Sequence, residues 1–262
     1  MSMGAPAAAI EGIGLWAPGL PSWEAFVAHR RGEPVAGGAP ARPAPALLPA
    51  NERRRAPDTV LVALQAAQDA CSAAGRDPAQ LPSVFASRYG DLAITDHLCR
   101  TLAQAPEEVS PTRFHNSVHN AAAGYWTIGT GAHQPATALS AGPASFAMGL
   151  VEALAQLAAG APAVLLVGYD GPSAGPLREV VPSEGLLGVA LVLAACGEHD
   201  RLRLRLQPDP AAAAAAPPED VAAGNAMAPA LALLAAIAEG APRTALPAGA
   251  GALVLQLEGS HG

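Results

Sequence analysis

Residues 137–149 read TALSAGPASFAMG, and this stretch decides the fold. An apolar strand, a sharp turn and the start of a helix follow one another here without a spacer. The small residues Ser140, Ala141 and Gly142 suit a tight strand-to-helix turn, and Pro143 has the backbone angle favoured in a first helical turn. The turn has the form of a nucleophile elbow, but no strong nucleophile stands at its bend.

Ser140 is the only hydroxyl at the bend itself. A hydrolase elbow has the pattern G-x-S-x-G, whereas this chain reads LSAGP, so the pattern is not met. Ser145 lies inside the following helix, where a capping or packing role is expected. A thiolase-fold acyltransferase or hydrolase that uses Ser140, with His115 or His119 as its base, stays open as an alternative.

The sequence on both sides of the elbow alternates between strands and helices. Strands are expected at 7–15, 83–91, 136–140, 161–170, 186–196, 201–207 and 251–258, and helices at 23–31, 58–74, 91–104, 116–130, 143–159 and 224–239. A Pro- and Gly-rich surface loop is expected at 32–50, and an Ala-rich link at 211–218. This alternation indicates one layered α/β domain over residues 1–262, with a mostly buried sheet.

Composition excludes several classes of protein. All fifteen basic residues are Arg and the net charge is -7, so no basic face for nucleic acid emerges. The one basic run, Arg53 to Arg55, is interpreted as a solvated helix start. Cys71, Cys99 and Cys196 are widely spaced, which argues against a disulfide framework and a zinc knuckle. No signal segment or apolar span of about 18 residues is present, so a cytoplasmic protein without a membrane span is expected.

His115 and His119 have the i, i+4 spacing that can place two imidazoles on one helical face. A zinc protease of that design needs Glu after the first His, where this chain has Asn116. We therefore expect no metal and no cofactor, and Asn116 is expected to cap a helix. Asp170 ends a strand, where it is either a turn former or an active-site residue.

Taken in order, several blocks resemble the β-ketoacyl synthases of the thiolase superfamily. The blocks are IEGIGLWAPG at 10–19, SPTRFHNSVHNAAAGYWTIGTGAHQPATALSAGPASFAMGLVEAL at 110–154, AVLLVGYDG at 163–171, SEGLLGVALVLAA at 183–195 and PPEDVAAGNAMAPALALLAAI at 217–237. The resemblance implies a thiolase-like layered αβαβα fold. It divides the chain into a first half, 1–198, and an abbreviated second half, 199–262.

The departures from that family concern its chemistry. In active ketosynthases the elbow carries a cysteine, and the matching position here is Ala141. The two histidine loops of the family's second half are also absent, since His199 and His261 lie in no such context. A nucleophile without its bases would be poor, and this chain has neither.

The resemblance is closest to the short ketosynthase-like subunits called chain length factors, in particular those of aryl polyene pathways. It implies a non-catalytic subunit that pairs with an active β-ketoacyl synthase, shapes its acyl tunnel and meets acyl carrier protein through that complex. The residues implied at the tunnel or partner interface are Arg113, Phe114, Ser117, Ala141 and Phe146, and those with a structural role are Asn120, Gly124 and Gly149. A partner that stabilises the ketosynthase without shaping its tunnel is a second alternative.

Shortening of the second half has a physical consequence as well. Removing covering elements should leave apolar sheet and helix surface exposed, and such patches mark interfaces. The uncovered surface is therefore a physical reason to expect association with a partner.

Overall fold

The computed structural model describes residues 5–35, 40–197 and 200–259. The strands are β1 (Ala7–Trp16), β2 (Ser83–Ala86), β3 (Ala136–Leu139), β4 (Ala163–Asp170), β5 (Leu187–Ala194), β6 (Leu202–Asp209), β7 (Arg243–Ala248) and β8 (Gly251–Gly259). The helices are α1 (Trp23–Arg30), α2 (Ala50–Arg55), α3 (Asp58–Ala74), α4 (Leu92–Gln104), α5 (Pro111–Asn116), α6 (Ala121–Thr130), α7 (Ser145–Ala158), α8 (Leu177–Val180) and α9 (Leu231–Glu239).

The described strands form one eight-stranded sheet in the order β3-β2-β4-β5-β1-β6-β8-β7. Strand β2 runs parallel to β3 and β4, and the other neighbours are antiparallel. The first five strands in this order come from the first half of the chain and the last three from the second. A ladder of only three residue pairs, Ala7–Ala9 with Arg203–Arg205, joins the two groups.

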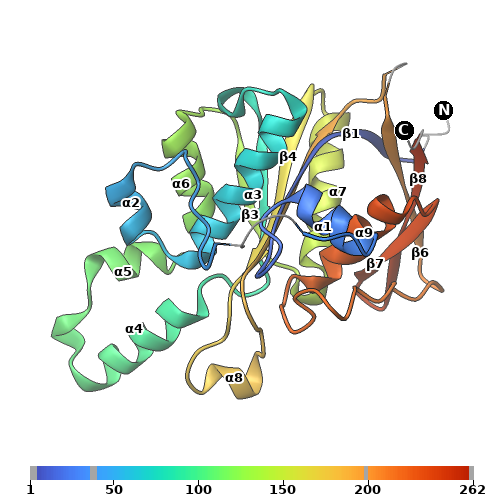
Figure 1. Ribbon diagram of the computed structural model, residues 1–262. Coiled ribbons are helices and arrows are strands. Elements are labelled where there is room, and N and C mark those ends of the chain that lie inside the picture. The colour runs from blue at the N-terminus through green and yellow to red at the C-terminus, as the bar shows by residue number, and fades with distance from the viewer. Residues whose placement is uncertain (1–4, 36–39, 198–199, 260–262) are drawn as a thin grey trace.

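The elements are stacked in layers (Figure 1). Helices α3 and α6 cover one face of the first five strands, and α7 and α9 lie between the other face and the β6–β8 group. The main hydrophobic core fills this middle layer, where Leu150, Leu166 and Leu233 are fully buried. The α/β thiolase-like fold is thus confirmed, with helices and strands in the layer order α, β, α, β.

The abbreviation of the second half concerns its outer layer. On the outer face of β7 and β8, the buried residues Ala245, Ala252 and Val254 are contacted by Ala212 of the Ala-rich link, where a further helical layer would complete the αβαβα order. The rest of this face carries long polar side chains from β6 and β8, including Arg205 and Glu258, which lie 3.9 Å apart. The outer face of β6 to β8 is therefore mostly polar, and the uncovered apolar sheet surface expected from the shortening is not found there.

The exposed large apolar side chains lie on the first half instead. They are Leu102, Phe114, Val118, Ile128, Val151 and Val180. Ile128 on α6 and Phe114 on α5 are 82% and 63% exposed. Polar residues therefore cover the outer face of the shortened second half. The exposed apolar side chains lie on the segment from α4 to α8.

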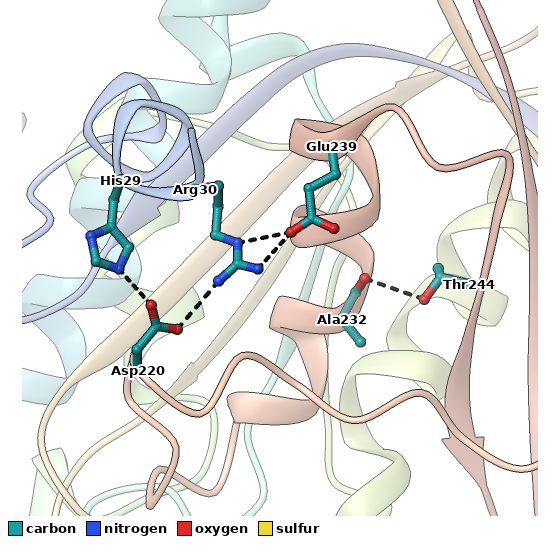
Figure 2. Close-up of polar contacts among 6 residues, drawn as sticks. All are labelled: His29, Arg30, Asp220, Ala232, Glu239 and Thr244. Atoms are coloured by element: carbon teal, nitrogen blue, oxygen red, sulfur yellow. Dashed lines mark hydrogen bonds and ion pairs between the residues drawn. The ribbon is translucent and has the colours of Figure 1, made fainter. Parts of the chain in front are cut away.

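Polar contacts tie α1 to the second half (Figure 2). Arg30 donates to Glu239 on α9 at 2.6 and 2.9 Å and lies 3.3 Å from Asp220. His29 lies 2.8 Å from Asp220 and holds the pKa of that carboxyl below its ordinary value. Because these groups are partly exposed, each pair contributes at most about 1 kcal/mol, and the apolar middle layer carries the association of the halves.

Several element boundaries differ from those expected. The helix expected at 116–130 is two helices, α5 and α6, because residues 117–120 form turns. Asn116 therefore ends α5 and caps nothing, and His119 lies in the turn, so the two histidines do not share a helical face. Arg53 to Arg55 form the last turn of α2 rather than a helix start, and α9 begins only at Leu231.

Other expectations are confirmed or fall outside the described residues. Helix α3 has the expected bounds, and β6 alternates as expected, with Leu204 and Leu206 buried. Strand β7 was not expected. The boundary at 198/199, part of the 32–50 loop (36–39), and His199 and His261 lie outside the described residues. No helix in the described part of the chain has the length and apolarity needed to cross a membrane.

Helix α3 approaches β1 closely because β1 carries glycine where the two meet. A Cβ on Gly14 would lie 2.0 Å from the carbonyl oxygen of Ala66, and one on Gly12 would lie 2.2 Å from that of Ala70. Both neighbours are helix backbone, which cannot move aside as a side chain can.

We expect Gly14→Ala to lower the free energy of unfolding by about 2 kcal/mol or more, because α3 must shift away from the sheet. Gly124→Ala is the matched control, since nothing lies within 4 Å of a Cβ there and Ala favours a helix over Gly by about 0.5–1 kcal/mol. Chemical denaturation of both variants measures the two effects. Equal stability of the two variants would contradict this account of the α3–β1 contact.

Candidate functional site

The candidate site lies where the parallel strands β2, β3 and β4 end. Carboxyl ends of parallel strands meet at one edge of a sheet, which is where sites of open α/β sheets gather. Three segments follow these ends: the turn 87–90 after β2, the elbow 140–142 after β3 and the loop after Asp170 at the end of β4.

The elbow has a defined hydrogen-bonded shape. Gly142 has φ +58°, a left-handed conformation that favours glycine, and Pro143 lies within the short 3-10 turn Gly142–Ala144. The Ser145 hydroxyl accepts from the N–H of Ala141 at 3.0 Å and donates to the carbonyl of Gly142 at 2.7 Å. Ser145 is the first residue of α7, is buried and does not cap the helix, so of the two expected roles the structure supports packing, and its hydroxyl closes the bend from the helix side.

The Asp170 carboxylate holds the neighbouring turn. It is 1% exposed and accepts three hydrogen bonds, from the Ser87 hydroxyl at 2.7 Å and from the N–H groups of Arg88 and Tyr89 at 2.9 and 3.1 Å. Ser87 Oγ in turn accepts from the N–H of Gly90 at 2.8 Å. Asp170 therefore stabilises a turn, but the turn belongs to a neighbouring strand: its carboxylate fixes the backbone that follows β2.

The same turn contacts the elbow and the segment between α5 and α6. Ser140 Oγ donates to the carbonyl of Arg88 at 3.0 Å, and His119 Nε2 lies 3.0 Å from the carbonyl of Ser87. The hydroxyl of Tyr169 donates to the carbonyl of His119 at 3.3 Å. The turn 87–90, the elbow and the α5–α6 turn thus form one connected unit.

Ser140 has no base in this arrangement. Its hydroxyl proton is directed at a backbone carbonyl, and among the described hydrogen bonds no imidazole contacts it. His119 is engaged with the Ser87 carbonyl, and His115 stands on exposed α5. The geometry gives no support to nucleophilic catalysis by Ser140.

The cysteines lie away from the elbow. Cys71 is buried in α3, and burial raises the pKa of its thiol to about 12. Cys99 lies on α4 and Cys196 follows β5, and both are exposed. The bend itself presents the methyl group of Ala141. Among the described residues, no cluster of three or more His, Cys, Asp or Glu side chains could hold a metal ion.

The residues expected at a tunnel or interface are not all in one place. Arg113 and Phe114 stand on exposed α5, and the Ser117 hydroxyl donates to the Phe114 carbonyl at 2.8 Å. Ala141 is exposed at the elbow. Phe146 is 2% exposed and packs in the core beside Gly168, so within this chain its side chain is a core residue.

Of the three residues expected to have structural roles, only Gly149 is closely packed within this chain. A Cβ on Gly149 would lie 2.8 Å from Leu166 and 3.1 Å from Ala86, so this glycine allows α7 to approach the sheet. Asn120 precedes α6 and makes no side-chain cap, and Gly124 has open space beside it. Among the described residues, neither the missing cap of Asn120 nor the open space at Gly124 shows a structural role within this chain.

Two cavities flank the α5–α6 segment. One of about 720 Å³ runs beside α6 and is lined by Leu47, Leu48, Pro49, Glu52, His115, Val118, Asn120, Ala121, Gly124, Tyr125, Ile128 and Gly129. The other, of about 460 Å³, contains Arg113 in its lining.

Sequence reasoning missed the unit formed by Asp170 and the turn 87–90. Ser87 and Asp170 are 83 residues apart, so no local pattern joins them. The available signal was that SRYGD and YDG each follow an apolar strand, since polar groups at the ends of neighbouring strands are expected to meet.

Burial raises the pKa of the Asp170 carboxyl from 3.8 to about 6, although its three hydrogen bonds and the nearby His119 act in the opposite direction. A folded-state pKa above the unfolded value means that the folded chain binds the proton more tightly. The stability contributed by this group is therefore present at low pH and is lost as pH rises through about 6.

We expect the wild type to lose stability relative to Asp170→Asn as pH rises. The difference between their free energies of unfolding, wild type minus variant, should fall by up to about 3 kcal/mol between pH 4 and 7. Chemical denaturation of both chains across this range provides the measurement. A difference that is constant or grows with pH would show that the Asp170 carboxyl is not perturbed by burial.

Residues 23–251 match the family described as "Beta-ketoacyl synthase, N-terminal domain". The fold, the strand-to-helix elbow and this match define a ketosynthase-like protein. The chain belongs to the β-ketoacyl synthase N-terminal domain family.

Solved structures of the same fold cover nearly the whole chain. A chain from the ketosynthase ApeO in complex with its chain length factor ApeC, from Xenorhabdus doucetiae, is 25% identical with a TM-score of 0.73, and the match covers 96% of this chain and 99% of that one. A chain of the ishigamide ketosynthase/chain length factor is 17% identical with a TM-score of 0.71, over 96% and 98% of the two chains. A chain from AntDE:AntF, an acyl-carrier protein in complex with its ketosynthase, is 11% identical with a TM-score of 0.73, over 98% and 100%. No curated protein matches this chain.

Proposed function

We propose that this chain is a chain length factor, a non-catalytic subunit that pairs with an active β-ketoacyl synthase and shapes its acyl tunnel. The observation that carries the proposal is an elbow that has its full hydrogen-bonded shape with the methyl group of Ala141 at its bend. A chain with this elbow and no thiol or base beside it can position an acyl chain but cannot take it up covalently. The similarity to chains from ketosynthase–chain length factor complexes supports the same conclusion.

An open sheet edge supports association with a partner. Strand β3 ends the sheet order, and no other strand of the described residues pairs with its free side. The carbonyls of Pro135 and Leu139 accept from β2, so odd-numbered residues face β2. Backbone groups alternate along a strand, so Ala136 and Ala138 direct theirs to the open edge, where a partner strand could pair.

The exposed apolar residues close to the β3 edge also support a partner interface there. Phe114, Val118 and Ile128 lie on α5, the following turn and α6, and α6 contacts β3. Neighbouring apolar groups of this kind mark interaction surfaces in a chain that otherwise carries polar residues outside. We therefore propose that the ketosynthase covers the β3 edge and the α5–α6 segment, and that acyl carrier protein meets the chain only through that complex.

We further propose that the product is a polyene of the aryl type and that Phe114 limits its length, together with Arg113 and Ser117. Phe114 offers the largest apolar side chain on α5 and is free to enter a neighbouring subunit. A ring that fills the end of an apolar tunnel sets the longest chain that fits.

Co-expression of this chain with the ketosynthase encoded nearest to it, followed by affinity capture and native mass determination, tests the partner role. We expect a stoichiometric complex that is lost in Ala138→Pro, because proline removes the N–H that faces the open edge and leaves the ladder with β2 intact. Ala138→Ser retains the N–H and is the matched control. Recovery of wild type without the ketosynthase, or capture that Ala138→Pro leaves unchanged, would contradict pairing through β3.

Reconstitution of the pair with Phe114→Ala tests the tunnel role. We expect longer products, because the cavity gains the volume of a phenyl ring, and no change for Val180→Ala, an exposed apolar residue on α8. Product lengths are read by mass spectrometry. Unchanged lengths with an intact complex would favour a partner that only stabilises the ketosynthase.

A further inference from the structure

The cavity of about 460 Å³ combines apolar walls with unpartnered hydrogen-bond donors. It lies between the α2–α3 junction, the start of α4, α5 and the segments beside β4 and β5. It is lined by Arg55, Pro57, Asp58, Thr59, Asp91, Ala93, Ile94, Ser110, Thr112, Arg113, Asn116, Pro172 and Leu186.

Asn116 is the buried donor of this cavity. Its side chain is 4% exposed, and its Oδ1 accepts from the hydroxyl of Tyr125 at 3.2 Å, which fixes the orientation of the amide. Its Nδ2 makes no hydrogen bond within the described part of the chain. Among the described residues, the side-chain polar atoms that are fully buried and lack a hydrogen-bond partner are Trp126 Nε1 and Gln156 Oε1. Asn116 Nδ2 also lacks a partner but is not among them, so this atom is accessible to solvent. Because Asn116 lines this cavity, we infer that the amide opens into it.

Two guanidinium groups line the same cavity from different elements. Arg55 ends α2 and Arg113 stands on α5, and neither forms an ion pair among the described residues. Guanidinium and amide N–H groups that converge on one space recognise an oxygen anion, and Arg does so with charge-assisted bonds.

The two carboxylates of the lining are already engaged. Asp58 pairs with Arg42 at 2.5 Å. Asp91 accepts from the N–H of Ile94 at 2.8 Å and from the Thr59 hydroxyl at 2.7 Å. Both carboxylates thus already have donors of this chain, whereas the guanidinium groups of Arg55 and Arg113 have no acceptor among the described residues and are free to bind an anion.

The apolar walls of the cavity indicate which chemical group is attached to the bound anion. Ala93, Ile94 and Leu186, with two prolines, give the cavity an apolar side that an inorganic anion would leave unused. We propose that this cavity binds a small organic carboxylate, with its oxygens at Arg55, Arg113 and Asn116 and a short apolar chain against Ile94 and Leu186. Arg113 then acts as a ligand-binding residue of this chain, independently of the proposed tunnel role.

Titration of the purified full chain with hexanoate, followed by calorimetry or by NMR of the ligand, tests the proposal. We expect saturable binding of hexanoate that weakens at least about tenfold for the neutral hexanamide, because the charge-assisted bonds are lost. Acetate, which lacks the apolar chain, should bind more weakly than hexanoate. This comparison needs no variant and no ketosynthase activity, so its failure would leave the partner role intact.

Variants localise the binding. Arg113→Gln and Arg55→Gln should each weaken hexanoate binding about tenfold, whereas Arg54→Gln, an exposed neighbour outside the lining, should not. Asn116→Leu should weaken it as well, and Tyr125→Phe controls for loss of the Asn116–Tyr125 bond. No saturable binding, equal binding of hexanamide, or equal effects of Arg54→Gln and Arg55→Gln would overturn the proposal.

Discussion

The carboxylate of Asp170 is the group on which the carboxyl edge of the sheet depends. It accepts three hydrogen bonds from the turn after β2, and that turn accepts from Ser140 at the elbow and contacts His119 before α6. A single buried anion therefore fixes the relative positions of three segments that are distant in sequence. Burial of an anion is costly unless it is hydrogen-bonded, and here the backbone of the turn supplies most of those bonds.

The second half is connected to the same point. The amide of Asn225 donates to the carbonyl of Asp170 at 3.2 Å and to those of Glu184 and Gly185 at 3.0 and 3.1 Å. The segment that leads into α9 is thus held at the end of β4 while α9 packs in the middle layer. The short second half completes the core without an outer layer because its outer face is polar, and the exposed apolar residues remain on the first half.

The parts of the fold that the sequence predicted have a clear local cause. Helix α3 begins after Pro57 and stops at Gly75 with φ +63°, and both signals are visible in the sequence. The break between α5 and α6 depends instead on local turns such as the bond from Ser117 to the Phe114 carbonyl, and apolar periodicity continues through it. Strand β7 contains Pro247, which argues against a central strand but is tolerated because β7 lies at the edge of the sheet. The Asp170 unit was missed because it joins residues 83 apart, and only the position of each segment at the end of an apolar strand indicated that they would meet.

The elbow explains how a chain of this fold can lack a nucleophile without losing its shape. The bend is held by the left-handed Gly142, by Pro143 and by the hydroxyl of Ser145. Ala141 contributes only backbone groups to these contacts, its N–H to Ser145 and its carbonyl to the N–H of Ala144, so its side chain takes no part in them. A methyl group there costs the elbow none of its hydrogen bonds. Chemistry and architecture are therefore separable at this position, because the hydrogen bonds that hold the strand, the bend and the helix together do not depend on the side chain that residue 141 carries.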